Sequence, residues 1–105
     1  MSITERIDAT TLIEAQHTGL VLPAPRSVKV SLDDHCQFEC RFCSSRLQPD
    51  KCEMPLPMFC RLVDELVLEG TKEIGLFYIG EPMLSRNLGY AVEYCRQTGI
   101  EYVFI

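Results

Sequence analysis

Three cysteines lie within eight residues of the chain. Cys36, Cys40 and Cys43 are spaced C-x3-C-x2-C, which is too dense for a strand or one face of a helix. This density predicts a loop whose sulfurs point at a common centre. Thiolates are soft ligands, and they suit zinc or an iron–sulfur cluster. Three protein ligands leave one metal position open, which is typical of a catalytic site rather than a structural one.

A second stretch, Gly80-Glu81-Pro82, follows an apolar run that reads as a strand. Gly80 lets a backbone approach another group closely, because glycine has no Cβ. Glu81 places a carboxylate at the C-terminal end of the predicted strand. In parallel α/β barrels that end of the strands forms the rim where active sites lie.

The cysteine stretch resembles the radical S-adenosylmethionine (SAM) superfamily, whose signature is C-x3-C-x-aromatic-C, and Phe42 stands in the aromatic position. Tyr78 to Pro82 resembles the glycine-glycine-glutamate-proline motif of that superfamily, with Ile79 in place of the first glycine. The resemblance covers the chain from Val28 to about Ile105.

The resemblance implies a [4Fe–4S] cluster held by Cys36, Cys40 and Cys43, with SAM as its second cofactor on the fourth iron. It implies reductive cleavage of SAM to a 5′-deoxyadenosyl radical that abstracts hydrogen from an unknown substrate. An electron donor such as flavodoxin or ferredoxin is the expected partner. The hard chemistry belongs to the cofactors, and the protein positions and shields them.

Four further residues are implied to bind the cofactor: Phe42, Gly80, Glu81 and Pro82. In this resemblance Glu81 accepts a hydrogen bond from the amino group of SAM, and the backbone near Phe42 contacts the adenine. Packing of Phe42 against a helix is an equal alternative.

Hydrophobic periodicity and turn residues predict alternating strands and helices. Helices are expected at residues 2–18, 57–69 and 87–98, and strands at residues 27–32, 73–79 and 101–105. This order predicts an α/β fold with a parallel sheet and right-handed crossovers. By resemblance it forms the first three βα units of a partial (βα)6 barrel. Residues 1–26 are then an N-terminal extension and linker, and residues 27–105 belong to the core domain.

The strands differ in their apolar patterns. The first alternates, with Val28, Val30 and Leu32 on one face and Lys29 and Ser31 on the other, where they face either a barrel lumen or an uncovered surface. The second is almost continuously apolar, which is typical of a parallel strand covered on both faces. The chain ends within an apolar strand, so we expect a portion of a longer enzyme that turns over little SAM by itself.

Composition bounds the classes of partner. The net charge is −5 and no basic patch occurs, which argues against nucleic-acid or anionic-membrane partners. No apolar run approaches the roughly 20 residues that span a bilayer. The first residues do not resemble a signal peptide, so a cytoplasmic location is expected.

Other interpretations of the same residues remain open. The thiols fit a zinc site completed by His35 or Cys52 in a non-enzymatic module, a non-enzymatic iron–sulfur electron carrier, or an inactive fragment that retains the motifs. Glu81 alone fits a solvated turn carboxylate. Cys95 completes an apolar helix stripe and is predicted in the core, whereas Cys52 and Cys60 are expected to be unliganded.

Overall fold

The structure, a computed structural model, describes residues 2–11, 20–21, 24–43, 51–78 and 80–105. The elements follow the order α1 (Ile3–Thr11), β1 (Ser27–Lys29), α2 (Leu56–Leu68), β2 (Glu73–Gly75), the short 3₁₀ helix η2 (Pro82–Leu84), α3 (Leu88–Thr98) and β3 (Tyr102–Phe104). The predicted α/β class is confirmed. The predicted helix at residues 2–18 is shorter, and residues 12–18 lie outside the described part of the chain.

The three described strands form one parallel sheet in the order β1-β2-β3. Ser27, Glu73 and Tyr102 lie side by side in its register at the N-terminal ends of the strands. The strands are shorter than predicted, although the Val30 amide still donates to the Gly75 carbonyl at 2.7 Å. Beyond that bond the backbones of β1 and β2 leave the ladder and enter the two motif-bearing loops.

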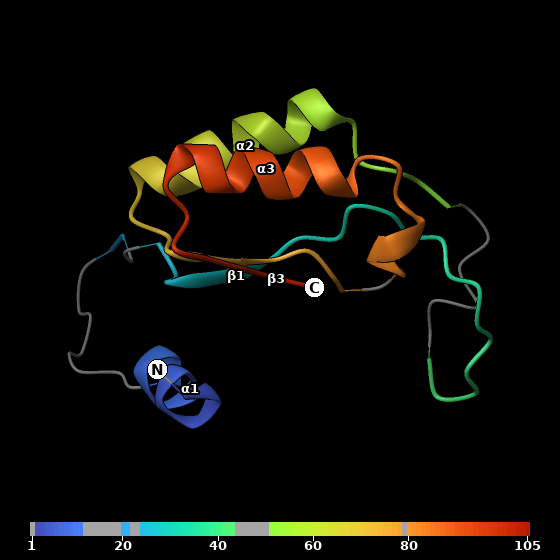
Figure 1. Cartoon of the computed structure of the whole chain (residues 1–105), viewed down its shortest axis with the longest axis horizontal. Helices are drawn as coiled ribbons and strands as arrows, with labels where there is room; N and C mark the ends of the chain where they lie inside the picture. Colours follow the sequence, from blue (N-terminus) through green and yellow to red (C-terminus); the bar gives the residue numbers. More distant parts are fainter. Residues whose placement is uncertain (1, 12–19, 22–23, 44–50, 79) are drawn as a thin grey trace.

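Helices α2 and α3 lie together on one face of the sheet (Figure 1). The fully buried side chains between these layers are Phe59, Val63, Ile74, Leu76, Ala91 and Cys95. Val30 and Leu32 join this core from the β1 side, as their alternation with polar residues predicts. Both helices end as predicted before a glycine, because Gly70 and Gly99 have φ angles of 97° and 95°, which other residues rarely adopt.

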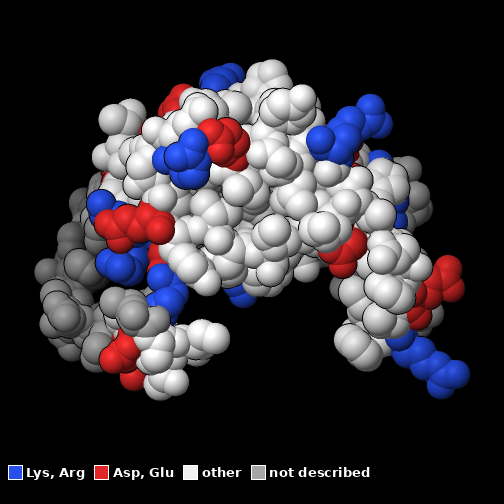
Figure 2. Space-filling model, in the orientation of Figure 1, with Lys and Arg blue, Asp and Glu red and all other residues white. Residues whose placement is uncertain are grey.

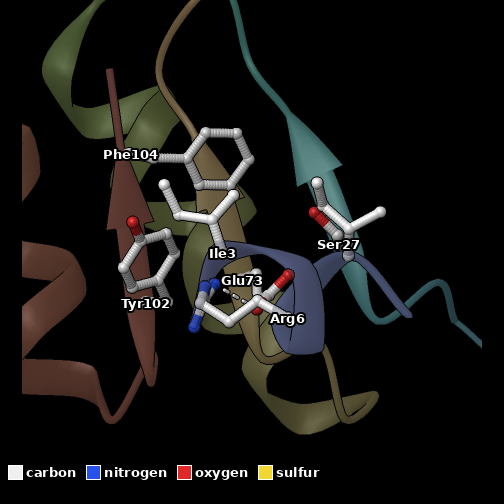
Figure 3. A pocket seen from close by; sticks show the side chains of 7 residues that line it. Ile3, Arg6, Ser27, Glu73, Tyr102 and Phe104 are labelled. Carbon is white, nitrogen blue, oxygen red and sulfur yellow. Dashed lines mark hydrogen bonds and ion pairs between the residues drawn. The ribbon is translucent and has the colours of Figure 1, made fainter. Parts of the chain in front are cut away.

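Of the elements described, α1 lies against the opposite face of the sheet, near the N-terminal ends of the strands (Figure 1). Figure 3 shows Arg6 of α1 reaching the buried Glu73 carboxylate, with Nη2 and Oε1 2.5 Å apart. The guanidinium also lies 3.3 Å from the centre of the Tyr102 ring. A pocket of about 350 Å³ beside this contact is also lined by Ile3, Ile7, Ser27 and Phe104. Helix α1 thus has a defined place against the sheet.

The expectation that residues 73–79 form a strand covered on both faces is wrong at Tyr78, which lies beyond the strand that ends at Gly75. Ile74 and Leu76 are buried on the helix side, but Tyr78 is 72% exposed. In the described part of the chain no second helical layer covers this region of the opposite face. Lys29 also lies on that open side, with its Nζ 5.2 Å from the centre of the Phe77 ring.

The surface carries both signs of charge. Figure 2 shows lysine and arginine side chains interspersed with aspartate and glutamate on the face drawn, with no broad area of one sign. Among the residues described, no helix has the length and apolar character needed to cross a membrane.

Phe59 tests the core directly, because it is fully buried between α2 and the sheet. We expect Phe59→Ala to lower the free energy of unfolding by about 3–5 kcal/mol, through lost apolar burial and the cavity it leaves. Urea denaturation followed by circular dichroism measures this. The neighbouring Met58 is 57% exposed, and Met58→Ala should change stability by only about 0.5 kcal/mol. Equal effects of the two variants would contradict the described packing.

Candidate functional site

The two sequence motifs lie at the same edge of the sheet. The cysteine loop follows β1 and the Gly80-Glu81-Pro82 turn follows β2, and these strands are parallel neighbours. Parallel strands place their C-terminal ends together, so both loops emerge on one side of the molecule, at the right in Figure 1. The two motif-bearing segments therefore lie next to each other.

Direct backbone contacts join these segments. The Glu81 amide donates to the carbonyl oxygen of His35 at 2.8 Å, and His35 immediately precedes Cys36. Gly80 packs against the backbone of Asp33 so closely that a Cβ at Gly80 would lie 1.8 Å from the Asp33 carbonyl oxygen. Glycine is required here because any side chain would collide with main-chain atoms.

The cysteine loop returns to its starting point. Residues 52–54 run antiparallel to residues 32–34 and close the loop at its base. The closing contacts are the Asp33–Glu53 bridge, the bond from the Asp34 amide to the Cys52 carbonyl (2.9 Å) and the bond from the Met54 amide to the Leu32 carbonyl (2.8 Å). The base of the loop is consequently held by β-type hydrogen bonds, although it lies outside the named strands.

The Asp33 carboxylate organises the exit from the strand. Asp33 is only 7% exposed, and its Oδ1 accepts the backbone amide of His35 at 2.7 Å. Nδ1 of the His35 ring bonds to the same oxygen. This carboxylate is therefore buried and doubly hydrogen-bonded, although an aspartate in a loop is most simply expected to be solvated. An aspartate side chain that accepts the backbone amide two residues later forms a common type of turn, so the sequence contains a local signal for this contact.

A second carboxylate ties the loop base to the turn. Oε1 of Glu53 accepts the hydroxyl of Ser85 at 3.1 Å, and Ser85 directly follows η2. The Ser85 side chain also accepts the Asn87 amide at 3.2 Å, near the start of α3. No feature of the sequence singles out Glu53 or Ser85, because their roles depend on a contact between residues 32 positions apart.

The three motif cysteines share one loop, but their thiols are not gathered. Cys36 and Cys40 are exposed and Cys43 is half-buried, and the Cys43 amide donates to the Cys40 carbonyl at 3.0 Å to close a turn. Within the described residues no three His, Cys, Asp or Glu side chains form a group able to hold a metal ion. Backbone hydrogen bonds fix the loop base and the turn at Cys40–Cys43. These bonds do not determine where the cysteine side chains point. The common centre of sulfurs stays a prediction.

The remaining predicted site residues flank the loop. Glu81 is half-buried and caps η2, its Oε1 accepting the Met83 amide at 3.1 Å, so it is not simply a solvated turn carboxylate. Pro82 is buried, which makes it part of the packing beneath the turn. Phe42 is 93% exposed, so the alternative that it packs against a helix is wrong. Its contact with adenine stays a prediction.

The other three cysteines occupy different environments. Cys95 is fully buried between α3 and the sheet, which confirms the predicted core thiol. Burial, with a smaller contribution from Cys60, raises the pKa of the Cys95 thiol to about 11. Cys60 is half-buried, and Cys52 is exposed at the loop base. Cys52 therefore lies near the motif cysteines along the surface, whereas Cys95 is separated from solvent.

The contact at Gly80 gives a test in which two glycines should respond with opposite signs. Gly80→Ala forces its Cβ against the Asp33 carbonyl, and we expect a loss of about 1–3 kcal/mol of unfolding free energy. Gly89 lies within α3 with nothing near its missing Cβ, so Gly89→Ala should stabilise the chain by about 0.5–1 kcal/mol. Chemical denaturation compares the two. A neutral Gly80→Ala would argue against the close approach of the two loops.

The environment of Cys95 predicts its reactivity. Alkylation requires the thiolate, and a raised pKa together with burial keeps Cys95 protonated and inaccessible near pH 8. We expect iodoacetamide to modify the exposed Cys52 in the native chain and to leave Cys95 unmodified until urea unfolds it. Peptide mass spectrometry at timed intervals measures both sites. Equal native rates for the two thiols would rule out the buried placement of Cys95.

Comparison with known proteins gives one similarity. The chain is 32% identical over 92 residues to a GTP 3′,8-cyclase from Rhizobium leguminosarum bv. trifolii (strain WSM2304), covering 82% of this chain and 26% of that protein. The chain thus spans about a quarter of the length of this curated relative. No protein-family profile matches the chain, and no solved structure matches it. The similarity to this cyclase, a radical SAM enzyme, supports a relationship to that superfamily at the level of the superfamily alone.

Proposed function

We propose that the chain is part of a radical SAM enzyme, in which a [4Fe–4S] cluster and SAM bind at the C-terminal edge of the sheet. The observation that carries this proposal is the hydrogen bond from the Glu81 amide to the His35 carbonyl. It sets a carboxylate-bearing turn against the residue that precedes the first motif cysteine. Two segments 45 positions apart in the sequence, at His35 and at Gly80, thereby form one local structure.

The donor set fits an iron–sulfur cluster chemically. Cys36, Cys40 and Cys43 would supply three thiolates, which are the usual ligands of such clusters. Because these cysteines are exposed or half-buried, a cluster could reach their sulfur atoms from solvent. Three ligands for four irons leave one iron for a small-molecule ligand, and SAM is the ligand that the motif resemblance implies.

The residues of the chain would bind and orient SAM. The Glu81 carboxylate accepts a backbone amide through Oε1 and stands beside the cysteine loop, where it would also accept a hydrogen bond from the SAM amino group. Gly80 would keep this turn close to the loop, and the exposed Phe42 would lie against the adenine. A reduced cluster held by the three cysteines would supply the single electron for reductive cleavage of SAM.

Partners follow from this chemistry. The cluster needs a one-electron donor of low potential, such as a flavodoxin or a ferredoxin. The radical needs a substrate, and the name of the similar cyclase makes GTP the first compound to test. Because this chain spans 26% of that protein, we propose that full activity requires the remaining part of an enzyme of similar length.

A zinc-binding module is the second candidate. The bond from the Asp34 amide to the Cys52 carbonyl places the Cys52 backbone at the base of the loop that carries the other three thiols. A fourth thiolate there would complete a closed tetrahedral site of the kind that structural zinc occupies. His35 is an alternative fourth ligand through Nε2, because the bond from its Nδ1 to the Asp33 carboxylate is the arrangement usual for metal-binding histidines.

Cluster assembly separates these candidates. Anaerobic reconstitution of the chain with iron and sulfide should give about four iron and four sulfide per chain, measured by colorimetric assay and optical spectrum. Cys40→Ala should abolish this cluster, because it removes one of three ligands. Cys52→Ala is the matched control and should retain the iron, since Cys52 lies outside the motif.

Three results would contradict the proposal. A full complement of iron in Cys40→Ala would show that the motif cysteines do not hold the cluster. Loss of iron in Cys52→Ala would show that Cys52 is a fourth protein ligand, which the three-ligand site excludes. One equivalent of zinc, held without iron after anaerobic preparation, would favour the zinc module.

A further inference from the structure

We propose that Asp33 is a positioning residue for the site, fixing the junction from which the cysteine loop and the Glu81 turn depart. This inference rests on the proposed function for its meaning, but its contacts stand independently of any bound cofactor. Asp33 lies outside both the C-x3-C-x2-C motif and the Gly-Glu-Pro motif, three residues before Cys36. Its role follows from four contacts that meet at one residue.

The side chain provides the first two contacts. Oδ1 of Asp33 accepts the His35 amide at 2.7 Å and bonds to Nδ1 of the same residue. Both bonds act on the residue that immediately precedes the first motif cysteine. A buried carboxylate that accepts two hydrogen bonds fixes the local backbone direction, because leaving it unpaired would cost its full desolvation. Asp33 therefore sets the direction in which the chain enters the loop.

The backbone provides the other two contacts. The carbonyl of Asp33 lies against Gly80, and the residue itself forms the antiparallel bridge with Glu53. The His35 carbonyl, which the Asp33 side chain helps to orient, accepts the Glu81 amide. A rotation of the backbone at this junction would therefore disturb the return of the cysteine loop and the placement of Glu81 together.

A neighbouring carboxylate gives a matched control. Asp34 carries the same charge one position later, is half-buried, and joins the loop base through its backbone amide. The Asp34 side chain is not among the groups that connect the loop to the turn. Substitution there changes net charge and local composition equally and leaves the four contacts of Asp33 in place.

Amide hydrogen exchange on the metal-free 105-residue chain tests the contacts. We expect Asp33→Ala to speed exchange of the Glu81 amide by about tenfold, because its acceptor at His35 loses its orientation. Asp33→Asn retains an oxygen acceptor and should restore slow exchange, and Asp34→Ala should leave the rate unchanged. Amides of α2 and α3 in the same spectra report whether each variant is folded.

The outcomes decide the proposal. A Glu81 amide that exchanges at the native rate in Asp33→Ala overturns it, as does equal acceleration in Asp34→Ala or a failure of Asp33→Asn to restore protection. If Asp33→Ala also loses protection throughout α2 and α3, His35→Ala becomes the deciding variant. It removes only the bond from the ring, and it should accelerate Glu81 selectively, by a smaller factor. No selective change would overturn the proposal.

A second measurement distinguishes positioning from simple stabilisation. In reconstituted, reduced protein, SAM should shift the electron paramagnetic resonance spectrum of the cluster. Asp33→Ala should keep its iron but lose this shift, while Asp33→Asn should keep both, because Glu81 is misplaced only in the alanine variant. A full SAM-dependent shift in Asp33→Ala would overturn the positioning role. If the natural chain assembles no cluster, the proposed function fails, whereas the exchange result still decides whether Asp33 holds the two loops together.

Discussion

The close approach of Gly80 to the Asp33 carbonyl is the constraint on which the candidate site depends. Two loops that leave neighbouring parallel strands lie near each other by topology, but topology alone leaves several ångströms of freedom. Main-chain contact at Gly80 and the bond from the Glu81 amide to His35 remove that freedom. A glycine is required because main-chain atoms cannot move aside as a flexible side chain can. The site is therefore assembled from backbone geometry first, and its side chains follow.

Beneath this junction the packed layers supply rigidity. Helices α2 and α3 bury Phe59, Val63 and Cys95 against β2, and this core fixes the ends of the strands from which the loops depart. The opposite face is anchored by α1 near the N-terminal ends, through Arg6 and Glu73. Among the described residues, the strand exits are therefore supported by the helix-covered core and by the hydrogen bonds at the loop base. Cys36 and Cys40 lie beyond this base and are exposed.

Three buried or half-buried carboxylates each bind a different segment of the chain. Glu73 pairs with Arg6 of α1, Asp33 holds His35, and Glu53 binds the hydroxyl of Ser85. Each is paired, as a buried or half-buried charge must be to offset its loss of hydration. Acidic residues, which a sequence alone suggests are solvated, thus hold helix α1, the exit of the chain from β1 and the base of the cysteine loop. The excess of acidic residues, which gives a net charge of −5, has structural uses at these three points.

The sequence by itself determined the parallel α/β order, the two helix stripes, the glycine stops at Gly70 and Gly99, and the burial of Cys95, because these follow from local periodicity and backbone preference. It also placed both motifs at strand ends. Only the tertiary structure decided that Asp33, Glu53 and Ser85 join the loops, that α1 docks on Glu73, and that Tyr78 is exposed. Those features depend on contacts between residues far apart in sequence, and no local pattern encodes which distant partner a carboxylate or a glycine will meet.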